Sequence, residues 1–365
     1  MMELNCLCDI YSGYAFKSFN DTSDGIPVIK IGNILSDGTI ELTDCVYTEE
    51  VPKEKYYSKK DDIYIALSGA TTGKIGVMQT DGLYVINQRV GIIRNKGKIP
   101  NDYLKYFLVS KSNQILKEAS GCAQPNISPK QISKYDISIQ TEEKMLLITQ
   151  QLKKIEVILQ NYRNQIDLLD ELVKARFVEL FGDIISNDKN WNSKPLKELC
   201  DISRGASPRP ISDYLGGTIP WIKIGDATIG DSIYINLTKE HIIKEGVRKS
   251  RFIKKGSLIF ANCGVSLGFC RIINFDGCIH DGWLAFQNID TSLNKIFLLT
   301  TINQMTGYFR KIAPGGTQPN LNTDIVGNYI QVVPPLELQN QFADFVKEVD
   351  KSRFIIKSMI KEGLL

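Results

Sequence analysis

The sequence predicts an α+β protein in which two tandem β-rich domains are separated by long helices that form an antiparallel coiled coil. Three observations support this fold class. Three segments recur in the same order at a nearly constant offset, each copy contains short strand-like runs, and a long stretch without glycine or proline follows the first copy. The repeat is far too long for a solenoid, so it indicates the tandem duplication of a whole domain.

Three pairs of segments define the repeat. Residues 26–33 (IPVIKIGN) match residues 219–226 (IPWIKIGD) at an offset of 193 residues. Residues 63–73 (IYIALSGATTG) match residues 258–268 (LIFANCGVSLG) at an offset of 195, and residues 121–127 (GCAQPNI) match residues 315–321 (GGTQPNL) at an offset of 194. The two copies should therefore fold alike, and their differences should show what each copy is specialised to do.

Short runs rich in Ile, Val and Tyr, bounded by Gly, Asp and Asn, predict the strands of each copy. They cover residues 27–31, 63–67 and 84–93 in the first copy, and residues 221–224, 257–261 and 283–286 in the second. Asp-Gly pairs at 37–38, 81–82 and 276–277 are hairpin-turn signals. One or two helices are expected to follow in each copy, near residues 102–119 and 295–312. Each copy should be a curved sheet or half-barrel with a few helices.

The stretch from 142 to 181 predicts one long helix. Its apolar residues recur with gaps that alternate between four and three, the 3.5-residue period of a coiled-coil seam. This seam consists of Ile148, Leu152, Ile155, Leu159, Tyr162, Ile166, Leu169 and Val173. Gly182 is a natural stop, and at about 1.5 Å per residue the helix would be roughly 55–60 Å long. The alternative, a core helix of a globular domain, is less well supported because such helices are much shorter.

A shorter helix is expected at the end of the chain, after Pro334 and Pro335. Arg353 interrupts its apolar residues, which are Phe342, Val346, Val349, Ile356 and Ile360. Since each helix follows one copy, the two should pair in antiparallel fashion and leave the copies at opposite ends, related by an approximate two-fold. The predicted division is 1–141 and 183–334 for the repeated domains, and 142–182 and 335–365 for the helices.

Composition sets limits on the function. An apolar content of 43% and a charged content of 23% are those of an ordinary globular protein, so disorder is not indicated. The net charge of +3 neither requires nor excludes nucleic-acid binding. The long helix is slightly acidic, which favours a spacer and protein-docking surface over a helix that grips phosphates. With no N-terminal signal pattern and no apolar run of about 20 residues, we expect a soluble cytoplasmic protein without membrane contact.

No motif predicts a catalytic residue, a metal site or a bound cofactor. Cys6 and Cys8 are spaced C-x-C, but no C-x-x-C pair exists and the chain has two histidines, so reduced, buried cysteines are the better interpretation. Residues 69–75 (GATTGKI) are one residue too short for a phosphate-binding loop, and Ile75 stands where such a loop needs Ser or Thr. Glu142 and Lys144 have a nuclease-like spacing without the preceding acidic strand residue, and His280-Asp281 has no partnered nucleophile.

Polar residues in the glycine-rich turns predict a recognition surface. Gln and Asn amides can pair with adenine in the major groove, and glycines let a backbone approach phosphates. The candidates shared between the copies, or lying in their turns, are Ser68, Thr71, Thr72, Lys74, Gln124, Asn126, Asn262, Ser266, Gln318 and Asn320. The alternative is that these amides tie loops to their own backbone, and it is strongest for the Gln-Pro-Asn segments because both copies have them. Positions that differ between copies are better candidates for specificity: Gln88, Arg89, Arg204, Arg209, Asp281 and Trp283.

Together these features resemble the specificity subunit of type I restriction–modification systems, over essentially the whole chain. Two further segments support the resemblance: PPLELQ at 334–339 and FVELFGD at 177–183. It implies a non-catalytic subunit for defence against foreign DNA, in which each copy is a target-recognition domain that reads one half of a split site in double-stranded DNA. The helices would set the spacing and dock methyltransferase subunits. S-adenosylmethionine is expected on those subunits, and a motor-nuclease subunit is a further expected partner.

Alternatives stay open at the level of sequence. The shorter terminal helix leaves open a coiled coil paired over part of its length, a fragment or a natural variant. An interaction protein that keeps the docking helices but has lost DNA reading is a second hypothesis, and a stand-alone endonuclease is a third. Magnesium-dependent cleavage by the purified chain would distinguish the third, and binding of a methylation subunit without any change in DNA methylation would distinguish the second.

Overall fold

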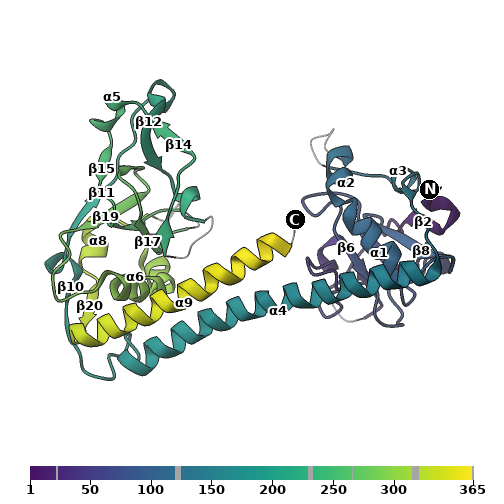
Figure 1. Ribbon diagram of the computed structural model, residues 1–365, viewed down its shortest axis with the longest axis horizontal. Coiled ribbons are helices and arrows are strands. Elements are labelled where there is room, and N and C mark those ends of the chain that lie inside the picture. The colour runs from purple at the N-terminus through teal and green to yellow at the C-terminus, as the bar shows by residue number, and fades with distance from the viewer. Residues whose placement is uncertain (22–23, 120–124, 229–232, 265, 315–319, 364–365) are drawn as a thin grey trace. The chain divides into compact units, whose positions relative to one another are not determined.

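The computed structural model describes residues 1–21, 24–119, 125–228, 233–264, 266–314 and 320–363. The chain forms two compact units, Met1–Gln160 and Asn161–Leu365, and each unit contains one copy of the repeat (Figure 1). The helix α4 (Glu142–Phe181) contributes its first half to the first unit and its second half to the second. Among the described residues, no helix is long and apolar enough to cross a lipid bilayer. The finer division into four segments remains a prediction.

The first unit contains two main sheets. The larger is antiparallel, in the order β2 (Cys8–Ser12), β8 (Val90–Asn95), β5 (Ile63–Ala66), β6 (Ile75–Val77). The smaller has the order β4 (Val46–Thr48), β3 (Ile26–Ile29), β7 (Val85–Ile86), with β3 and β7 parallel. The short strands β1 (Met2–Glu3) and β9 (Asp136–Ile137) pair with each other, and the helices are α1 (Asn101–Ser110), α2 (Ser112–Ala119) and α3 (Pro129–Ile132).

All four residues of strand β5 are buried, which places this strand in the interior of the first unit. Its alternate side chains serve two different cores, as the two-residue period of a strand requires. Ile63 and Ile65 pack in the cluster that also contains the α1 residues Leu104 and Leu108. Tyr64 faces the cluster that includes residues of the smaller sheet. The strand thereby connects the helical layer to the second sheet.

The second unit repeats this plan with additions. Its larger sheet has the order β11 (Asp201–Arg204), β19 (Trp283–Gln287), β16 (Leu258–Ala261), β17 (Cys270–Ile273), β13 (Tyr234–Ile235). The other has the order β14 (Glu240–Ile242), β12 (Leu215–Ile222), β18 (Gly277–Ile279), β15 (Arg251–Ile253), and β10 (Asn192–Pro195) pairs with β20 (Ile330–Val333). The short helices are α5 (Lys244–Val247), α6 (Lys295–Gln304), α7 (Thr306–Ile312) and α8 (Thr323–Gly327). The shared strand order confirms that the copies fold alike.

One sequence prediction was wrong in detail. The strand expected at residues 84–93 is two strands, β7 and β8, because the chain leaves the smaller sheet at Ile86 and enters the larger one at Val90. The helical region expected near residues 102–119 and 295–312 consists of two helices in each copy, within the one or two that the sequence predicts. The break in the second copy lies at Met305, and the hydroxyl of Thr306, the first residue of α7, donates to the Gly268 carbonyl over 2.9 Å, so the helical layer bends where it meets the glycine-rich turn.

The helix α4 has the predicted bounds, and in the second unit α9 (Leu336–Gly363) runs antiparallel to its second half. The ring centroids of Phe177 and Phe342 lie 5.3 Å apart, and the Arg176 guanidinium lies 6.0 Å from the Phe345 ring centroid. Closer to the C-terminus of α9, Arg353 forms an ion pair with Asp170. Thus residue numbers rise along one helix as they fall along the other, as the predicted antiparallel pairing requires.

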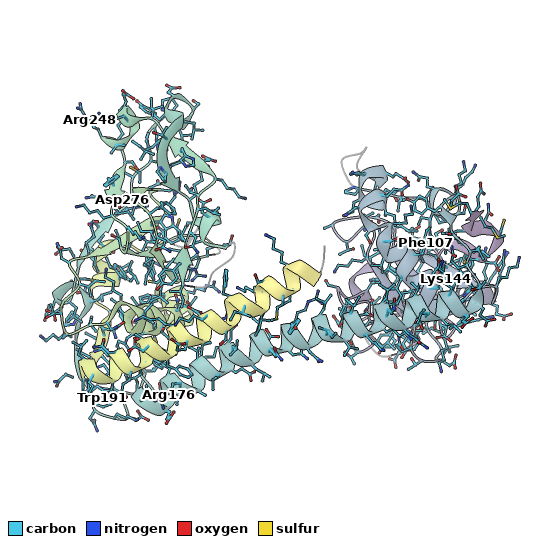
Figure 2. All side chains as sticks on the ribbon, viewed as in Figure 1. Phe107, Lys144, Arg176, Trp191, Arg248 and Asp276 are labelled. Atoms are coloured by element: carbon cyan, nitrogen blue, oxygen red, sulfur yellow. The ribbon has the colours of Figure 1, made fainter. Side chains whose placement is uncertain are left out.

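The two helices bury their largest side chains where they pack into the core of the second unit. Phe177, Phe181, Phe297 and Phe342 are fully buried there. Trp191 closes the end of α4, because its indole N–H donates to the Phe181 carbonyl over 2.9 Å (Figure 2).

Burial along the predicted seams is uneven. Most of the α4 seam is half-buried, but Ile155 is 44% exposed and so does not pack as the heptad predicts. On α9, Phe342, Val346 and Val349 are buried, whereas Ile356 is half-buried.

Candidate nucleic-acid interface

Loops from four parts of each copy meet in one arrangement, which we call the loop cluster. In the first copy it comprises residues 13–17, 68–74, 87–89 and 125–127; in the second it comprises residues 205–209, 263–264, 266–269, 280–282 and 320–321. A bridge between Ser68 and Asn126 joins the glycine-rich turn to the Pro-Asn segment, and the bridge between Cys263 and Asn320 does the same in the second copy. Segments that the sequence places far apart are therefore neighbours in both copies.

Backbone hydrogen bonds tie the loop cluster together identically in the two copies. The Leu67 amide donates to the Arg89 carbonyl over 2.9 Å, and its counterpart Asn262 donates to Gly282 over 3.0 Å. A further equivalent pair links the first loop to the strand that follows the turn: Gly13 to Val90 at 2.9 Å and Gly205 to Trp283 at 2.8 Å. This correspondence makes Asn87 equivalent to His280, and Gln88 equivalent to Asp281.

Close backbone approach explains why Gly13 and Gly205 occupy the same place. A Cβ on Gly13 would lie 2.3 Å from the Ile86 carbonyl oxygen, and one on Gly205 would lie 2.1 Å from the His280 carbonyl oxygen. Real Cβ atoms do not come so close, so only glycine fits. The sequence reasoning missed this pair because it did not predict β2 or β11; a glycine directly after the short segments 8–12 (CDIYS) and 201–204 (DISR) was the signal that could have found it.

The structure separates the predicted site residues by exposure. Six are exposed: Gln88, Arg89, Asn126, Arg204, Arg209 and Asn320. Five are half-buried: Ser68, Thr71, Lys74, Ser266 and Asp281. Three are buried: Thr72, Asn262 and Trp283. Gln124 and Gln318 lie outside the described residues.

Burial argues against direct DNA contact by Thr72, Asn262 and Trp283. The Thr72 hydroxyl donates to the Gly69 carbonyl over 2.7 Å and closes the glycine-rich turn. The Asn262 amide donates to the Leu321 carbonyl over 3.2 Å, as the alternative of loops tied to their own backbone predicts. Trp283 is fully buried in a core cluster, with Phe269 packed edge-on against it. These three residues build the loop cluster from within.

In the second copy, Asp281 organises a group of charged and polar side chains. The Ser207 hydroxyl donates to its Oδ1 over 2.7 Å, and His280 Nε2 lies 2.9 Å from the same oxygen. Arg209 Nη2 lies 3.6 Å from Oδ2, and Arg204 Nε donates to the Asp281 main-chain carbonyl over 3.0 Å. Two arginines expected from the sequence thus contact one aspartate, Arg209 at its carboxylate and Arg204 at its main-chain carbonyl.

The protonation states of this pair follow from its surroundings. Burial lowers the pKa of His280, and the nearby cations Lys223, Arg209 and Arg204 lower it further, against the opposing effect of Asp281. His280 Nδ1 accepts the Gly282 N–H over 2.9 Å, so the neutral ring carries its proton on Nε2 and donates it to Asp281. Burial alone would raise the pKa of Asp281, but the Ser207 hydroxyl and the nearby His280 and Arg209 outweigh it, and the pKa is lowered.

A basic segment borders this group in the second copy. Arg251 Nε donates to the Arg204 carbonyl over 3.2 Å, and the Ser250 hydroxyl donates to the Ala206 carbonyl over 2.7 Å. The exposed cations of the segment are Lys244, Arg248, Lys249 and Arg251. At the equivalent place the first copy has residues 49–56 (EEVPKEKY), which carry more acidic than basic side chains. The two copies therefore present different charge beside the same scaffold.

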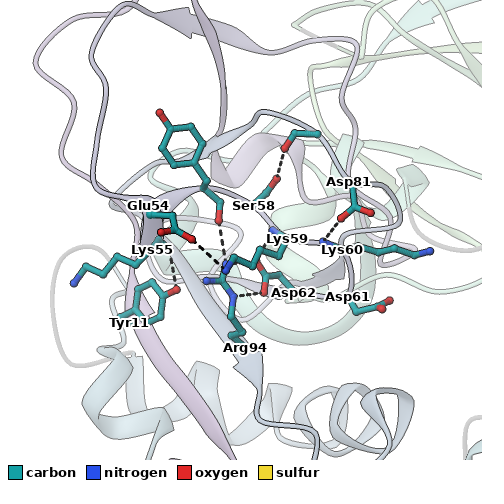
Figure 3. Close-up of polar contacts among 12 residues, drawn as sticks. Tyr11, Glu54, Lys55, Ser58, Lys59, Lys60, Asp61, Asp62, Asp81 and Arg94 are labelled. Atoms are coloured by element: carbon teal, nitrogen blue, oxygen red, sulfur yellow. Dashed lines mark hydrogen bonds and ion pairs between the residues drawn. The ribbon is translucent and has the colours of Figure 1, made fainter.

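In the first copy an ion pair between the half-buried Arg94 and the buried Asp62 holds residues 55–62, which overlap the end of that segment (Figure 3). Arg94 donates to both carboxylate oxygens of Asp62 over 2.7 and 2.6 Å, and to the Tyr57 carbonyl over 3.0 Å. The Lys59 amide also donates to Asp62, and the Tyr11 hydroxyl donates to the Lys55 carbonyl over 2.8 Å. These contacts fasten residues 55–62 to the larger sheet and leave their lysines exposed.

Among the described residues, no group of three or more His, Cys, Asp or Glu side chains is placed to hold a metal ion. Cys8, Cys200, Cys270 and Cys278 are buried, as expected, whereas Cys6 is exposed. Burial raises the pKa of the Cys8 thiol to about 12, so that thiol is unreactive. What the loop clusters offer is exposed hydrogen-bonding and cationic side chains on a rigid backbone.

Comparison with known proteins agrees with this arrangement. The family model described as the type I restriction modification DNA specificity domain matches residues 1–174 and again residues 188–365. The Type I restriction enzyme MjaIX specificity subunit of Methanocaldococcus jannaschii is 26% identical over 185 residues, covering 49% of this chain and 43% of that protein. The MjaVIII specificity subunit of the same organism is 20% identical over 326 residues, covering 82% of this chain and 75% of that protein.

Two solved structures share the fold. The type I restriction–modification S subunit from M. genitalium has a TM-score of 0.55 at 15% identity, covering all of this chain and 92% of that one. A chain from work on complex assembly and conformational transition of the type I R-M system has a TM-score of 0.56 at 17% identity, covering 99% and 93%. The family model accounts for both copies of the repeat. The chain belongs to the family of the type I restriction modification DNA specificity domain.

Proposed function

We propose that this chain is the DNA-reading, non-catalytic subunit of a type I restriction–modification complex, with each copy reading one half of a bipartite site in double-stranded DNA. The observation that carries the proposal is the duplicated loop cluster, whose backbone hydrogen bonds agree between the copies while the exposed side chains differ. A common scaffold with different side chains suits two halves of unlike sequence, because base edges are read by side chains in the grooves.

The helices have a separate role in this proposal. They set the spacing between the two halves, as dimer spacing does in other DNA readers, and they dock methyltransferase subunits. The second half of α4 and the end of α9 expose apolar side chains, including Leu168, Leu172 and Phe354, that a partner protein could cover. S-adenosylmethionine would bind to those partner subunits, and a motor-nuclease subunit would join for cleavage. The role implies a cytoplasmic location, where the DNA lies.

The test is reconstitution with the methyltransferase subunits of the source cell. We expect the chain alone to bind DNA weakly, and the complex to bind and methylate one bipartite sequence. Equal affinity for all sequences in the complex would contradict the proposal. Methylome sequencing with and without the gene gives the same answer in the cell, because loss of the gene should remove one methylated motif. Exchange of residues 195–333 for those of a relative should then change one half-site only.

A further inference from the structure

We propose that Arg209, held in place by Asp281, reads a guanine in the half-site recognised by the second copy, and that the first copy lacks this reading device. The inference rests on the proposed function and adds the base that one side chain selects. It comes from the group around Asp281, from the exposure of Arg209, and from what the first copy has in the same places.

Arg209 is free to reach a ligand while remaining oriented. Its side chain is 82% exposed, yet Nη2 lies 3.6 Å from Asp281 Oδ2. Within the part of the chain that the structure describes, this contact involves one nitrogen and leaves the rest of the planar guanidinium available. Guanine offers O6 and N7 in the major groove as two adjacent acceptors, and a bidentate arginine is the commonest specific contact to them. An exposed arginine steered by a carboxylate has the chemistry for that contact.

Asp281 is a positioning residue and does not itself read a base. Its Oδ1 accepts hydrogen bonds from Ser207 and from His280, at 2.7 and 2.9 Å, and Oδ2 faces Arg209. Three donors thus surround a half-buried carboxylate, which leaves little of it for a cytosine amino group. The lowered pKa of Asp281 keeps it anionic, so it can hold the guanidinium.

The first copy has the same backbone with different side chains. Counted from the equivalent glycines Gly13 and Gly205, the place of Arg209 is taken by Lys17, and the place of Asp281 is taken by Gln88. Lysine is a compact point charge without the planar fork of arginine, and an amide does not orient a cation as a carboxylate does. The second copy therefore carries a guanine-reading pair that the first copy does not.

The basic segment provides cations that should affect the affinity for DNA without affecting which base is preferred. Arg248 and Lys249 are exposed beside the loop cluster, and among the described residues no carboxylate forms an ion pair with either of them; Lys249 contacts the Tyr214 hydroxyl. Such cations suit phosphates, which add affinity and salt dependence but carry no sequence information. Arg248→Ala is therefore a matched control for Arg209→Ala, since each removes one exposed arginine from the same region.

The experiment selects DNA from a library randomised in both halves, using the full chain in its reconstituted complex. Wild type should require guanine at one position of the second half-site. Arg209→Ala should lower the preference for guanine there by about 5- to 150-fold, the worth of one bidentate pair, and leave the first half unchanged. Arg209→Lys and Asp281→Asn should lower it in part. Arg248→Ala should weaken binding to all sequences alike and reduce the salt slope by about one.

Each other result overturns the assignment. If Arg209→Ala weakened binding equally for every sequence, Arg209 would be a phosphate contact. If the change fell in the first half-site, or at no position, the pairing of this residue with the second half would be wrong. A wild-type complex without any sequence preference would instead contradict the proposed function itself, so the two failures are distinguishable. Because Arg209 is mostly exposed, its variants are expected to fold, and the Asp281→Asn variant tests the positioning role separately.

Discussion

Asp170 on α4 and Arg353 on α9 form an ion pair across the two antiparallel helices of the second unit. Arg353 also pairs with Asp350 one turn earlier on its own helix, and its side chain is only 11% exposed, whereas that of Asp170 is 52% exposed. The arginine that interrupts the apolar pattern of the terminal helix therefore occupies the seam and is neutralised there. Its partner on α4 fixes which residues of the two helices meet.

This pair predicts how the seam responds to substitution. Arg353→Ala should lower the free energy of unfolding by about 1–3 kcal/mol, mainly through lost packing, because the exposed Asp170 left behind is hydrated. Arg353→Leu should cost less or stabilise, since an apolar residue restores the heptad. Urea denaturation of wild type, Arg353→Ala, Asp170→Ala and the double variant completes a double-mutant cycle, in which the coupling should be about 0.5–1 kcal/mol, and Arg353→Leu is measured beside it. An Arg353→Leu variant less stable than Arg353→Ala would contradict this account of the seam.

The aromatic cluster predicts a larger effect. Phe342 is fully buried against Phe177 and Phe181, so Phe342→Ala should destabilise the second unit by about 3–5 kcal/mol through lost burial and a remaining cavity. The matched control is Phe354→Ala on the same helix, because Phe354 is 73% exposed and its loss should change stability by less than about 1 kcal/mol. Thermal unfolding followed by circular dichroism measures both. Equal losses would mean that α9 is not docked through Phe342.

In the first unit, the buried carboxylate of Asp62 should be essential for holding residues 55–62 in their folded conformation. Asp62→Asn removes the anion that Arg94 faces and should destabilise the unit by about 3–5 kcal/mol, because the arginine is left without its charge partner in a mostly buried place (Figure 3). Asp61→Asn is the control, since Asp61 is exposed with φ of 68°, a conformation that asparagine also tolerates. Hydrogen exchange of residues 55–62 should rise in the first variant and stay as in wild type in the second.

The close approach at Gly205 predicts a loop-specific defect. Gly205→Ala would set a methyl group against the His280 carbonyl, so the loop cluster of the second copy should open at a cost of about 1–3 kcal/mol. Gly225→Ala in the same domain has nothing within 4 Å of its new Cβ and serves as control. Limited proteolysis of the folded chain would report the opening as new cleavage near residues 205–209. Equal protection of both variants would argue against the observed packing.

Protonation of His280 should loosen the same cluster. Burial lowers its pKa below the ordinary 6.5, so the folded state favours the neutral ring. The unfolded chain then binds more protons between the folded pKa and 6.5, and stability should be fully present above about pH 6.5 and fall as the pH drops through that window. The chain has two histidines, so NMR titration with His241→Asn as control assigns the signal. His280→Asn, which introduces the residue of the first copy, should remove this part of the pH dependence.

The long helix and the duplication could be predicted from the sequence because each produces a regular pattern, the heptad period in one case and the repeated segments in the other. The bounds 142–181 follow from an uninterrupted heptad and the absence of helix breakers, and no tertiary contact overrides them. The strand at 84–93 could not be divided correctly, because the residues on both sides of the turn have the same β propensity and only the sheet partners distinguish them.

The candidate site was harder to predict for a related reason. Trp283 differs between the copies, and the sequence predicts base contacts at divergent positions, but a core position can diverge for packing alone. The roles of Ser207 and Gly205 depend on contacts with residues about 75 positions later in the chain, which no local pattern encodes. Exposure of Gln88, Arg89, Arg204 and Arg209 is compatible with the predicted role, and which of them touch bases stays a prediction.

The hydrogen bonds that the two loop clusters have in common join main-chain atoms, and this has a consequence for how such a protein can change. Because amide and carbonyl groups supply the ties, a mutation of Gln88 or Arg209 removes none of them. Side chains at these positions carry little of the folding energy and are open to selection for other properties. A lineage could therefore acquire a new preference by single substitutions, each close to neutral for folding. The fold of each domain and its base preference can therefore evolve independently of each other.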